Sequence, residues 1–554
     1  MRTTYSIGLD FGTLSARAML VDNATGAAMA ASVFEYPHGV IDSRLPESGV
    51  ALPDNYALQH PQDYIEALEW LLGDVWRRGG VRPEDIVGIG VAFTGSTLIP
   101  VDRSIRPLCF DPRFAAQPHA WPMLWKHHGT QAQADRINRV AAERGEAFMR
   151  RYGGKSSAEW TIAKVLNVLE EAPEVYEAAH RFVDAGDWIV YLLTSSLTRN
   201  SCCAGYKVFW SGADGFPSRD FFAALHPRME DVIDEKIGRQ VNPIGSRAGS
   251  LSEAVARRTG LSPRTRVGVA NLDAHTAVPA TGICREGQLL MIMGTSLCQM
   301  VNSTRAVEIP GINGSIRDGI LPGFYGVEAG QTAVGDIYDW FVSNCVPREY
   351  ADEALQTGEN LFQVLTRKAA ALRPGASGLL ALDWWNGNRS MLVDFNLTGL
   401  IMGLTLTTRP EEIYRALIES TAFGSRVIAE SLEQSCGMPF EIFACGGLSR
   451  KSPLVMQIFS DVLGREIRVS AAEQATALGA AIYGALAAGA ADGGYDDIFE
   501  AIGRMSSGVD RVYSPNAENH AVYTRLFGEY RRLHDLFGRE QPTMKTLLEI
   551  KRGL

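Results

Sequence analysis

Short apolar runs alternate with longer amphipathic segments along most of this chain of 554 residues. Runs of β-type residues predict strands at 86–93, 266–272, 441–447 and 466–470. Apolar positions at helical spacing predict helices over 158–169 and 410–432. Strands that alternate with helices in this way are typical of an α/β fold.

Residues 6–21 break this alternation, because two apolar arms flank Gly12-Thr13 with no helical segment between them. This pattern predicts an antiparallel β-hairpin. A second hairpin is predicted around Gly294-Thr295-Ser296, which also lies between two apolar runs. Small residues let the backbone approach an anion closely, and successive backbone N–H groups bind anions. Two such turns, far apart in the sequence, predict two related domains that hold one polyphosphate between them.

These features divide the chain into an N-terminal domain over 1–287, a C-terminal domain over 288–491 and a helical tail over 492–554. In the tail, apolar residues recur at helical spacing and predict a helix packed on the body through Val522, Leu526, Leu533 and Phe537. The stretch 477–491 is rich in Ala and Gly and is too short to span a membrane. We interpret it as a tightly packed, buried helix.

Composition and charge narrow the class of protein. The net charge of −10 argues against a nucleic acid as the main partner, since such binding needs a basic face. It also argues against an anionic membrane surface, and the N-terminus runs straight into a predicted strand with no secretory signal. The eight cysteines show no CxxC pair, so we expect reduced thiols and a cytoplasmic protein.

Asp10 lies two residues before the first turn, at the end of a predicted buried strand. Mg²⁺ prefers one or two carboxylates together with phosphate oxygens and waters. Asp10 therefore predicts a magnesium ligand beside the phosphates, with an Asx turn that starts the hairpin loop as the alternative.

Asp273 lies where a predicted strand ends and a helix begins, and the second turn follows it. A carboxylate in that place can take the proton of an acceptor hydroxyl during phosphoryl transfer, or it can simply cap the helix. Gly446-Gly447 follows another strand and precedes a helix predicted near Ser452, so a flat base could lie against this backbone. The chain has no Walker A motif, which means that any ATP site has another architecture.

Five segments in order resemble the FGGY family of carbohydrate kinases: DFGTLSARA, LDAHTAV, MGTS, GLTLTTRPEEIYRALIESTAF and CGGLSRKSPLVMQIFSDVL. The resemblance runs from about residue 5 to 490. It implies two ribonuclease-H-like domains, as in the actin, hexokinase and Hsp70 superfamily, with ATP and Mg²⁺ bound in the cleft between them. The nucleotide-binding residues it implies are Gly12, Thr13, Gly294, Thr295, Ser296, Gly446 and Gly447, with Asp10 as the metal ligand.

Within that family, further segments are similar to the ribulokinases, among them TGSTLIPVD, LWKHH, GGKSSAEW, CAGYKVFW and LDWWNGNRS. This resemblance implies phosphorylation of L-ribulose to L-ribulose 5-phosphate in L-arabinose catabolism, with Asp273 as the general base. It places Ser96, Trp125, Lys207, Asp273 and Glu328 around the sugar, although Ser96 is a variable position in the family set. Carboxylates and an ammonium group are suited to sugar hydroxyls. A homodimer is an option that the sequence leaves open.

Three alternatives remain from the sequence. The chain could phosphorylate another ketopentose such as D-ribulose or D-xylulose. It could be an ATPase similar to actin or Hsp70, since the two turns fit such a protein equally well. It could also be an inactive sugar sensor, although the presence of both Asp10 and Asp273 counts against that.

Overall fold

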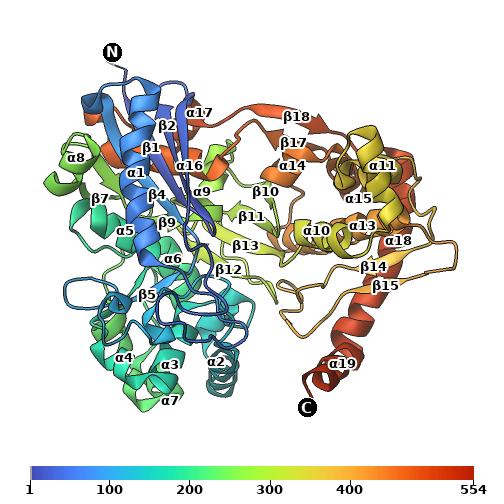
Figure 1. Cartoon of the computed structure of the whole chain (residues 1–554), viewed down its shortest axis with the longest axis horizontal. Helices are drawn as coiled ribbons and strands as arrows, with labels where there is room; N and C mark the ends of the chain where they lie inside the picture. Colours follow the sequence, from blue (N-terminus) through green and yellow to red (C-terminus); the bar gives the residue numbers. More distant parts are fainter. Residues whose placement is uncertain (1–2, 554) are drawn as a thin grey trace.

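The computed structural model describes residues 3–553 and consists of two lobes, each built around a seven-stranded mixed sheet (Figure 1). The first sheet contains β1 (Tyr5–Phe11), β2 (Ser15–Asp22), β3 (Ala28–Glu35), β4 (Ile86–Phe93), β7 (Arg247–Ser250), β8 (Arg266–Gly268) and β9 (Asn271–Leu272). The second contains β10 (Gln288–Met293), β11 (Leu297–Ser303), β12 (Gly314–Arg317), β13 (Tyr325–Gln331), β16 (Glu441–Cys445), β17 (Ile467–Ser470) and β18 (Val509–Tyr513). The α/β fold class is confirmed.

The two sheets repeat one pattern of strands. The first has the order β3-β2-β1-β4-β8, and the second has the order β13-β11-β10-β16-β17. In each, three strands are antiparallel and the last two run parallel to the first strand of the hairpin. The two hairpins predicted around Gly12 and Gly294 are thus confirmed, and they occupy the same place in the two sheets.

Helices cover both sheets. The first lobe contains α1 (Pro61–Gly79), α2 (Gln131–Arg144), α3 (Thr161–Glu171), α4 (Pro173–Ala178), α5 (Ala185–Thr194), α6 (Ser201–Val208), α7 (Arg219–Leu225), α8 (Glu253–Thr259) and α9 (Asp273–Ala280), with a small sheet of β5 (Leu98–Val101) and β6 (Arg181–Asp184). The second part of the chain contains α10 (Gly335–Asn344), α11 (Arg348–Thr357), α12 (Leu361–Ala370), α13 (Pro410–Cys436), α14 (Gly447–Lys451), α15 (Pro453–Leu463), α16 (Ala475–Ala488), α17 (Ile498–Met505), α18 (Ala517–Asp535) and α19 (Thr543–Arg552), with β14 (Leu380–Leu382) pairing β15 (Leu400–Met402).

Most predicted elements are present with small changes of boundary. The strand predicted at 86–93 is β4, and the helix predicted over 410–432 is α13, which continues to Cys436. The run 266–272 is not one strand, because β8 and β9 are separate and pair with different parts of β4. The helix predicted near Ser452 is preceded by the short helix α14, which starts at Gly447 directly after β16.

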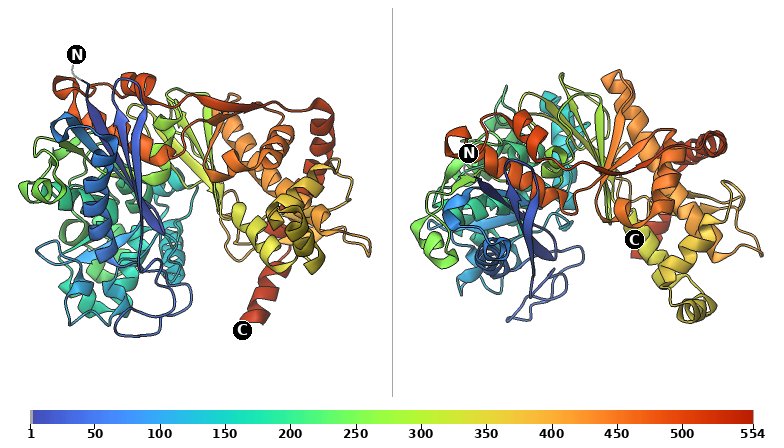
Figure 2. Two further views of the ribbon diagram at one scale, coloured as in Figure 1. Left: turned by 45° about the horizontal axis from the view of Figure 1, so that its top comes forward. Right: turned by 90° about the horizontal axis from the view of Figure 1, so that it is seen from above.

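The Ala- and Gly-rich stretch forms α16, which is buried as predicted but packs on the sheet of the other lobe. Glycines make this close contact possible. A Cβ added to Gly8 of β1 would lie 1.8 Å from the carbonyl oxygen of Ala477, and one on Gly90 of β4 would lie 1.8 Å from that of Ala480. Side chains of β2, α9, β10, α16 and α17 share one hydrophobic core, so this core joins the two lobes. The overlap of the lobes here is visible in both views of Figure 2.

The C-terminal segment differs from the predicted helical tail in two respects. β18 adds an antiparallel strand to the edge of the second sheet, beside β17. The predicted helix is α18, and Leu526, Leu533 and Phe537 are partly buried against the core as predicted, whereas Val522 is 37% exposed. The side chains that are buried are Tyr523, Phe527, Tyr530 and His534. The aromatic rings fill the core while their polar ends find partners, which an aliphatic pattern does not reveal.

Across residues 3–553, we find no helix whose length and hydropathy would let it cross a membrane. All eight cysteines are free thiols.

Candidate active site

Three predicted site segments follow three neighbouring parallel strands of the first sheet. β1 and β4 pair Phe11 with Phe93, and β4 and β9 pair Phe93 with Leu272. The residues that come next, Gly12, Thr94 and Asp273, therefore lie side by side at one edge of the sheet. The carboxyl ends of parallel strands are where open α/β sheets bind their ligands.

The second sheet brings its own predicted segments together in the same way. β10 and β16 are parallel and pair Ile292 with Cys445, which places Gly446 beside Met293, the residue directly before Gly294. Gly446 has a φ of 98°, a conformation that favours glycine, and a Cβ there would lie 2.4 Å from the carbonyl oxygen of Met293. A Cβ on Gly447 would meet no atom within 4 Å, so the backbone here is open to a ligand.

The first turn is connected to the predicted sugar side of the site. Trp125 Nε1 donates a hydrogen bond of 3.1 Å to Thr13 Oγ1, and Gln59 Nε2 donates one of 2.7 Å to the Thr13 carbonyl. Trp125 is only partly buried, so it is not the core residue that an indole at this position could have been. A residue predicted for the sugar thus contacts a residue predicted for the phosphates.

Asp10 is buried near the end of β1, and among the described residues Arg17 is the one cation that pairs with it. Arg17 lies 3.4 Å from Asp10 Oδ2 and is itself 39% exposed. Burial raises the pKa of Asp10, and Arg17 opposes this shift. A buried carboxylate with so little compensation fits a divalent cation, which prefers such an oxygen together with phosphate oxygens and waters. The donor chemistry at this position is therefore compatible with Mg²⁺.

Asp273 is the first residue of α9 and is not its N-cap, which is Leu272. Its Oδ1 accepts a hydrogen bond of 2.7 Å from the Ala274 N–H, which fixes the carboxylate at the helix start. Burial raises the pKa of Asp273 to about 7, and the negative charge of Asp10 adds to this effect. A carboxyl group whose pKa is close to neutral is suited to accept a proton at physiological pH.

Lys207 of α6 and Glu328 of β13 come from different lobes and meet in the interior. Lys207 Nζ lies 4.0 Å from Glu328 Oε2, which is too long for a hydrogen bond. His275 Nε2 lies 3.4 Å from the same oxygen. Among the described residues, neither Glu328 Oε2 nor either ring nitrogen of His275 has a hydrogen-bond partner. Buried polar atoms without partners are rare, so this group is suited to a polar ligand.

The other oxygen of Glu328 is well satisfied. Asn313 Nδ2 donates a hydrogen bond of 3.1 Å to Glu328 Oε1, and Arg389 contributes one of 3.4 Å. Burial opposes ionisation of Glu328, but the nearby Lys207, His275 and Arg389 hold its pKa well below the usual range. Glu328 is therefore a permanent anion that can accept hydrogen bonds from hydroxyl groups.

The structure adds residues that the sequence reasoning did not assign. Arg389 lies between two carboxylates, because it is also 3.9 Å from Glu159 Oε2 in the first lobe. Although Glu159 is buried, Arg389 and His128 lower its pKa to about 2. Glu159 and Arg389 belong to GGKSSAEW and LDWWNGNRS, two of the segments that resemble the ribulokinases. The sequence alone gave neither residue a role in the site. His275 and Asn313 complete the set.

Ser96 is fully buried in the turn that follows β4. Its hydroxyl donates a hydrogen bond of 3.1 Å to the Glu159 carbonyl, so toward any further group it can only accept. A small pocket lined from both lobes lies next to this region. Its lining includes Lys155, Glu159 and Trp160 of the first lobe and Asn313 and Arg389 of the second.

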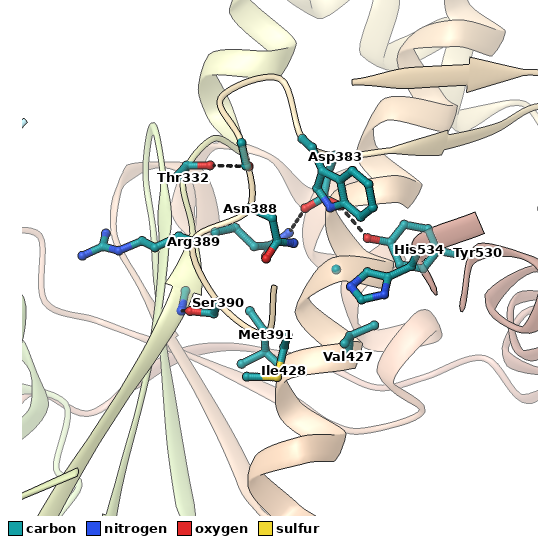
Figure 3. Close-up of a pocket in the computed structure, with 15 residues that line it drawn as sticks. Thr332, Asp383, Asn388, Arg389, Ser390, Met391, Val427, Ile428, Tyr530 and His534 are labelled. Carbon is teal, nitrogen blue, oxygen red and sulfur yellow. Dashed lines mark hydrogen bonds between the residues drawn. The ribbon is translucent and has the colours of Figure 1, made fainter. Parts of the chain in front are cut away.

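A second cavity lies inside the second lobe, beneath the loop 383–391 (Figure 3). Tyr530 of α18 and Gln331 each donate a hydrogen bond of 2.6 Å to Asp383, and Arg389 points away from this cavity. Among the described residues that line it, none belongs to the predicted site. We assign this cavity to the packing of α18 on the lobe.

Comparison with known proteins gives independent evidence for the family of this chain. The model of the N-terminal domain of the FGGY family of carbohydrate kinases matches residues 5–278, and that of its C-terminal domain matches 289–488. The chain is 49% identical over 539 residues to the ribulokinase of Bacillus licheniformis, which covers 97% of this chain and 98% of that protein. It is also 49% identical over 552 residues to the ribulokinase of Halalkalibacterium halodurans, covering 100% of this chain and 98% of that one.

Among solved structures, the fold is similar to that of xylulose kinase from Rhodospirillum rubrum. The TM-score is 0.77 at 23% sequence identity, over 96% of this chain and 98% of that one. The architecture of two lobes is thus shared at low sequence identity.

Proposed function

This chain belongs to the FGGY family of carbohydrate kinases, and on that premise we propose that it phosphorylates L-ribulose to L-ribulose 5-phosphate. It is an ATP-dependent carbohydrate kinase by family. The observation that carries the choice of sugar is the 49% identity, over nearly the full length of both chains, to proteins known as ribulokinases. The ATPase alternative left open by the sequence does not agree with this family membership.

The proposed reaction joins the two sheet edges. Gly294, Thr295 and Ser296, with Gly446 and Gly447 beside them, bind ATP from the second lobe, while Gly12 and Thr13 approach its phosphates from the first. The terminal hydroxyl oxygen of the sugar attacks the γ-phosphorus, the bond from that phosphorus to the bridging oxygen of ADP breaks, and Asp273 takes the hydroxyl proton. Because the transition state is loose, most of the catalysis is positioning and charge stabilisation.

Asp10 would hold Mg²⁺ in this scheme. The ion would neutralise charge on the phosphate oxygens when bound, which is its usual contribution to phosphoryl transfer. Its fit is supported by the sparse compensation of the buried Asp10 carboxylate.

The sugar is proposed to lie among Ser96, Trp125, Lys207, Asp273 and Glu328. Two features support this. Lys207 and Glu328 are too far apart to bond each other, so both remain available to hydroxyl groups. The indole of Trp125, partly buried and fixed by its bond to Thr13, can cover an apolar face of the sugar. Asn313 and Arg389 would orient Glu328 through its other oxygen, while His275 lies beside the free one.

The direct test is ADP release by the purified full-length chain with L-ribulose, D-ribulose, D-xylulose, glycerol and sugar alcohols, each with and without Mg²⁺. We expect the highest kcat/KM with L-ribulose, and a phosphate ester at O5 in the ³¹P and ¹³C NMR spectra of the product. A higher kcat/KM with another ketopentose would replace L-ribulose by that sugar. ADP release that no sugar stimulates would overturn the proposal.

The cellular compartment and the oligomeric state complete the proposed function. We propose that the enzyme works in the cytoplasm, which suits its eight free thiols and its need for ATP. A homodimer remains a prediction, and the mass of the purified chain in solution tests it.

A further inference from the structure

Two of the first-lobe segments that carry predicted sugar-binding residues are loops, unlike the helices that carry Lys207 and Asp273. Ser96 lies in the turn between β4 and β5, and Trp125 lies in the irregular segment between β5 and α2. Loops are more mobile than the elements they connect unless specific contacts fix them. The structure therefore has to supply such contacts if the two residues are to act on one sugar.

Lys164 of α3 supplies contacts to both loops. Its side chain is fully buried, and its Nζ donates hydrogen bonds to the backbone carbonyls of Ser96 (2.7 Å) and Leu124 (2.9 Å). A third, longer bond of 3.3 Å reaches the Met123 carbonyl. An ammonium group has three N–H donors, so all of them are used. One side chain thus connects the Ser96 turn with the residue that directly precedes Trp125.

This arrangement is costly for a residue that only fills space. The residues on either side of Lys164 in α3 are apolar and fully buried, namely Ile162, Ala163, Val165 and Leu166. A buried charge costs free energy, and apolar residues of similar volume often stabilise a core at least as well. The side chain is therefore better explained by what it holds than by the stability it contributes.

We propose that Lys164 is a positioning residue that fixes the Ser96 turn and the Trp125 loop in one arrangement for binding the sugar. This inference rests on the sugar site proposed above. Lys164 acts through backbone carbonyls and does not contact the sugar, so its loss affects sugar binding and leaves the nucleotide side unchanged.

The same lobe contains a matched control. Lys236 is also buried, and its Nζ donates hydrogen bonds to the backbone carbonyls of Tyr176 (2.8 Å) and Ala179 (2.6 Å). These carbonyls lie at the end of α4, in a segment that carries none of the predicted site residues. Lys236 therefore has the same chemistry as Lys164 without the connection to the sugar loops.

The experiment compares Lys164→Met with Lys236→Met in the full-length chain. We expect Lys164→Met to raise the KM for L-ribulose about tenfold or more while the KM for ATP stays unchanged, since only sugar-binding contacts are lost. Lys236→Met should lower the melting temperature and leave both KM values as in the wild type. Lys164→Arg, which keeps the charge and the donors, should restore part of the sugar affinity.

A folded Lys164→Met variant whose sugar KM equals that of the wild type would overturn the inference. So would equal changes in the two methionine variants. A wild type that phosphorylates no ketopentose would instead refute the proposed function, so the two failures are distinguishable.

The wild type offers a second measurement in case Lys164→Met does not fold. Burial lowers the pKa of Lys164 to about 7, and repulsion from Lys207 adds to this effect. Glu159 before α3, Asp184 at the end of β6 and Cys203 on α6 act in the opposite direction. Above that pH a neutral amine has two donors for three carbonyls, so the sugar dissociation constant should rise with pH. In Lys164→Arg, which stays charged, that rise should be absent. Identical pH dependences in the two proteins would also overturn the inference.

Discussion

The two Gly-Thr hairpins share a backbone but differ in charge. Each is a three-residue turn between antiparallel strands, at the same position of its sheet. Two residues before Gly12 stands the carboxylate of Asp10, whereas two residues before Gly294 stands Ile292. The duplicated fold thus supplies the same turn twice, and a single buried carboxylate distinguishes the first turn from the second.

The hairpins also differ in what anchors them. The first is bonded through Thr13 to Trp125, on the proposed sugar side. The second is anchored within its own lobe, because the N–H groups of Val334 and Gly335 donate to the carbonyls of Thr295 (2.7 Å) and Gly294 (3.2 Å). We infer that the first turn couples phosphate to acceptor and that the second serves the nucleotide alone.

The largest effect is expected where the two halves of the reaction meet, at Asp273. Asp273→Asn keeps the shape of the side chain but removes the base, so kcat should fall by about 10³-fold. Nucleotide affinity, measured by ADP titration, should change little. Asp220→Asn, at an exposed aspartate in the first turn of α7, is the control. A kcat within a factor of about three of the wild type would remove Asp273 as the base.

The next largest effect tests the difference in charge between the hairpins. Asp10→Asn should lower kcat by about 10²-fold and raise the Mg²⁺ concentration needed for half-maximal rate, because the carboxylate ligand is lost. The matched change Ile292→Asn, at the corresponding position of the second hairpin, should leave the Mg²⁺ requirement unaltered. If both variants shifted the Mg²⁺ dependence equally, the hairpins would not differ as we propose.

A pH profile sharpens the same comparison. The pKa of Asp273 is raised to about 7, mainly by burial and partly by Asp10. A base must be ionised, so kcat/KM should fall roughly tenfold for each pH unit below about 7 and level off above it. Asp10→Asn removes a neighbouring negative charge and should move this acidic limb to lower pH, whereas Ile292→Asn should not. A profile that is flat from about pH 5 to 8 would contradict the assignment.

The smallest effect concerns the anchors. Thr13→Val removes the acceptor of the Trp125 hydrogen bond, which is worth about 1 kcal/mol, so the sugar KM should rise by about fivefold. Thr295→Val in the second hairpin should change the KM for ATP and leave that for the sugar. Steady-state kinetics with each substrate varied separately gives both values. An unchanged sugar KM in Thr13→Val would show that the first turn does not communicate with the acceptor.

The sequence predicts strongly patterned elements well and long-range polar partners poorly. β4 is found where predicted, because a fully buried strand leaves a continuous apolar run. In α18 the most deeply buried side chains were not predicted, because Tyr523 and Tyr530 bury their rings while bonding Glu419 and Asp383. No local pattern contains such information.

The candidate site follows the same rule. Asp10, Gly12 and Gly294 can be predicted, because turn chemistry is local. The placement of Arg389 between Glu159 and Glu328 cannot, because three segments far apart in the chain have to fold before these charges meet. Lys164 gave no signal either, since in the sequence it is one lysine within an amphipathic helix.

The backbone-to-backbone contact of α16 with β1 and β4 has a consequence for anyone who divides this protein. A fragment ending near residue 287 would lack the helix that covers its own sheet, and the complementary fragment would expose that helix. We expect each half to aggregate when expressed alone and the two to recover solubility when co-expressed. The chain is therefore better suited to a split reporter that reassembles than to study as two separate modules.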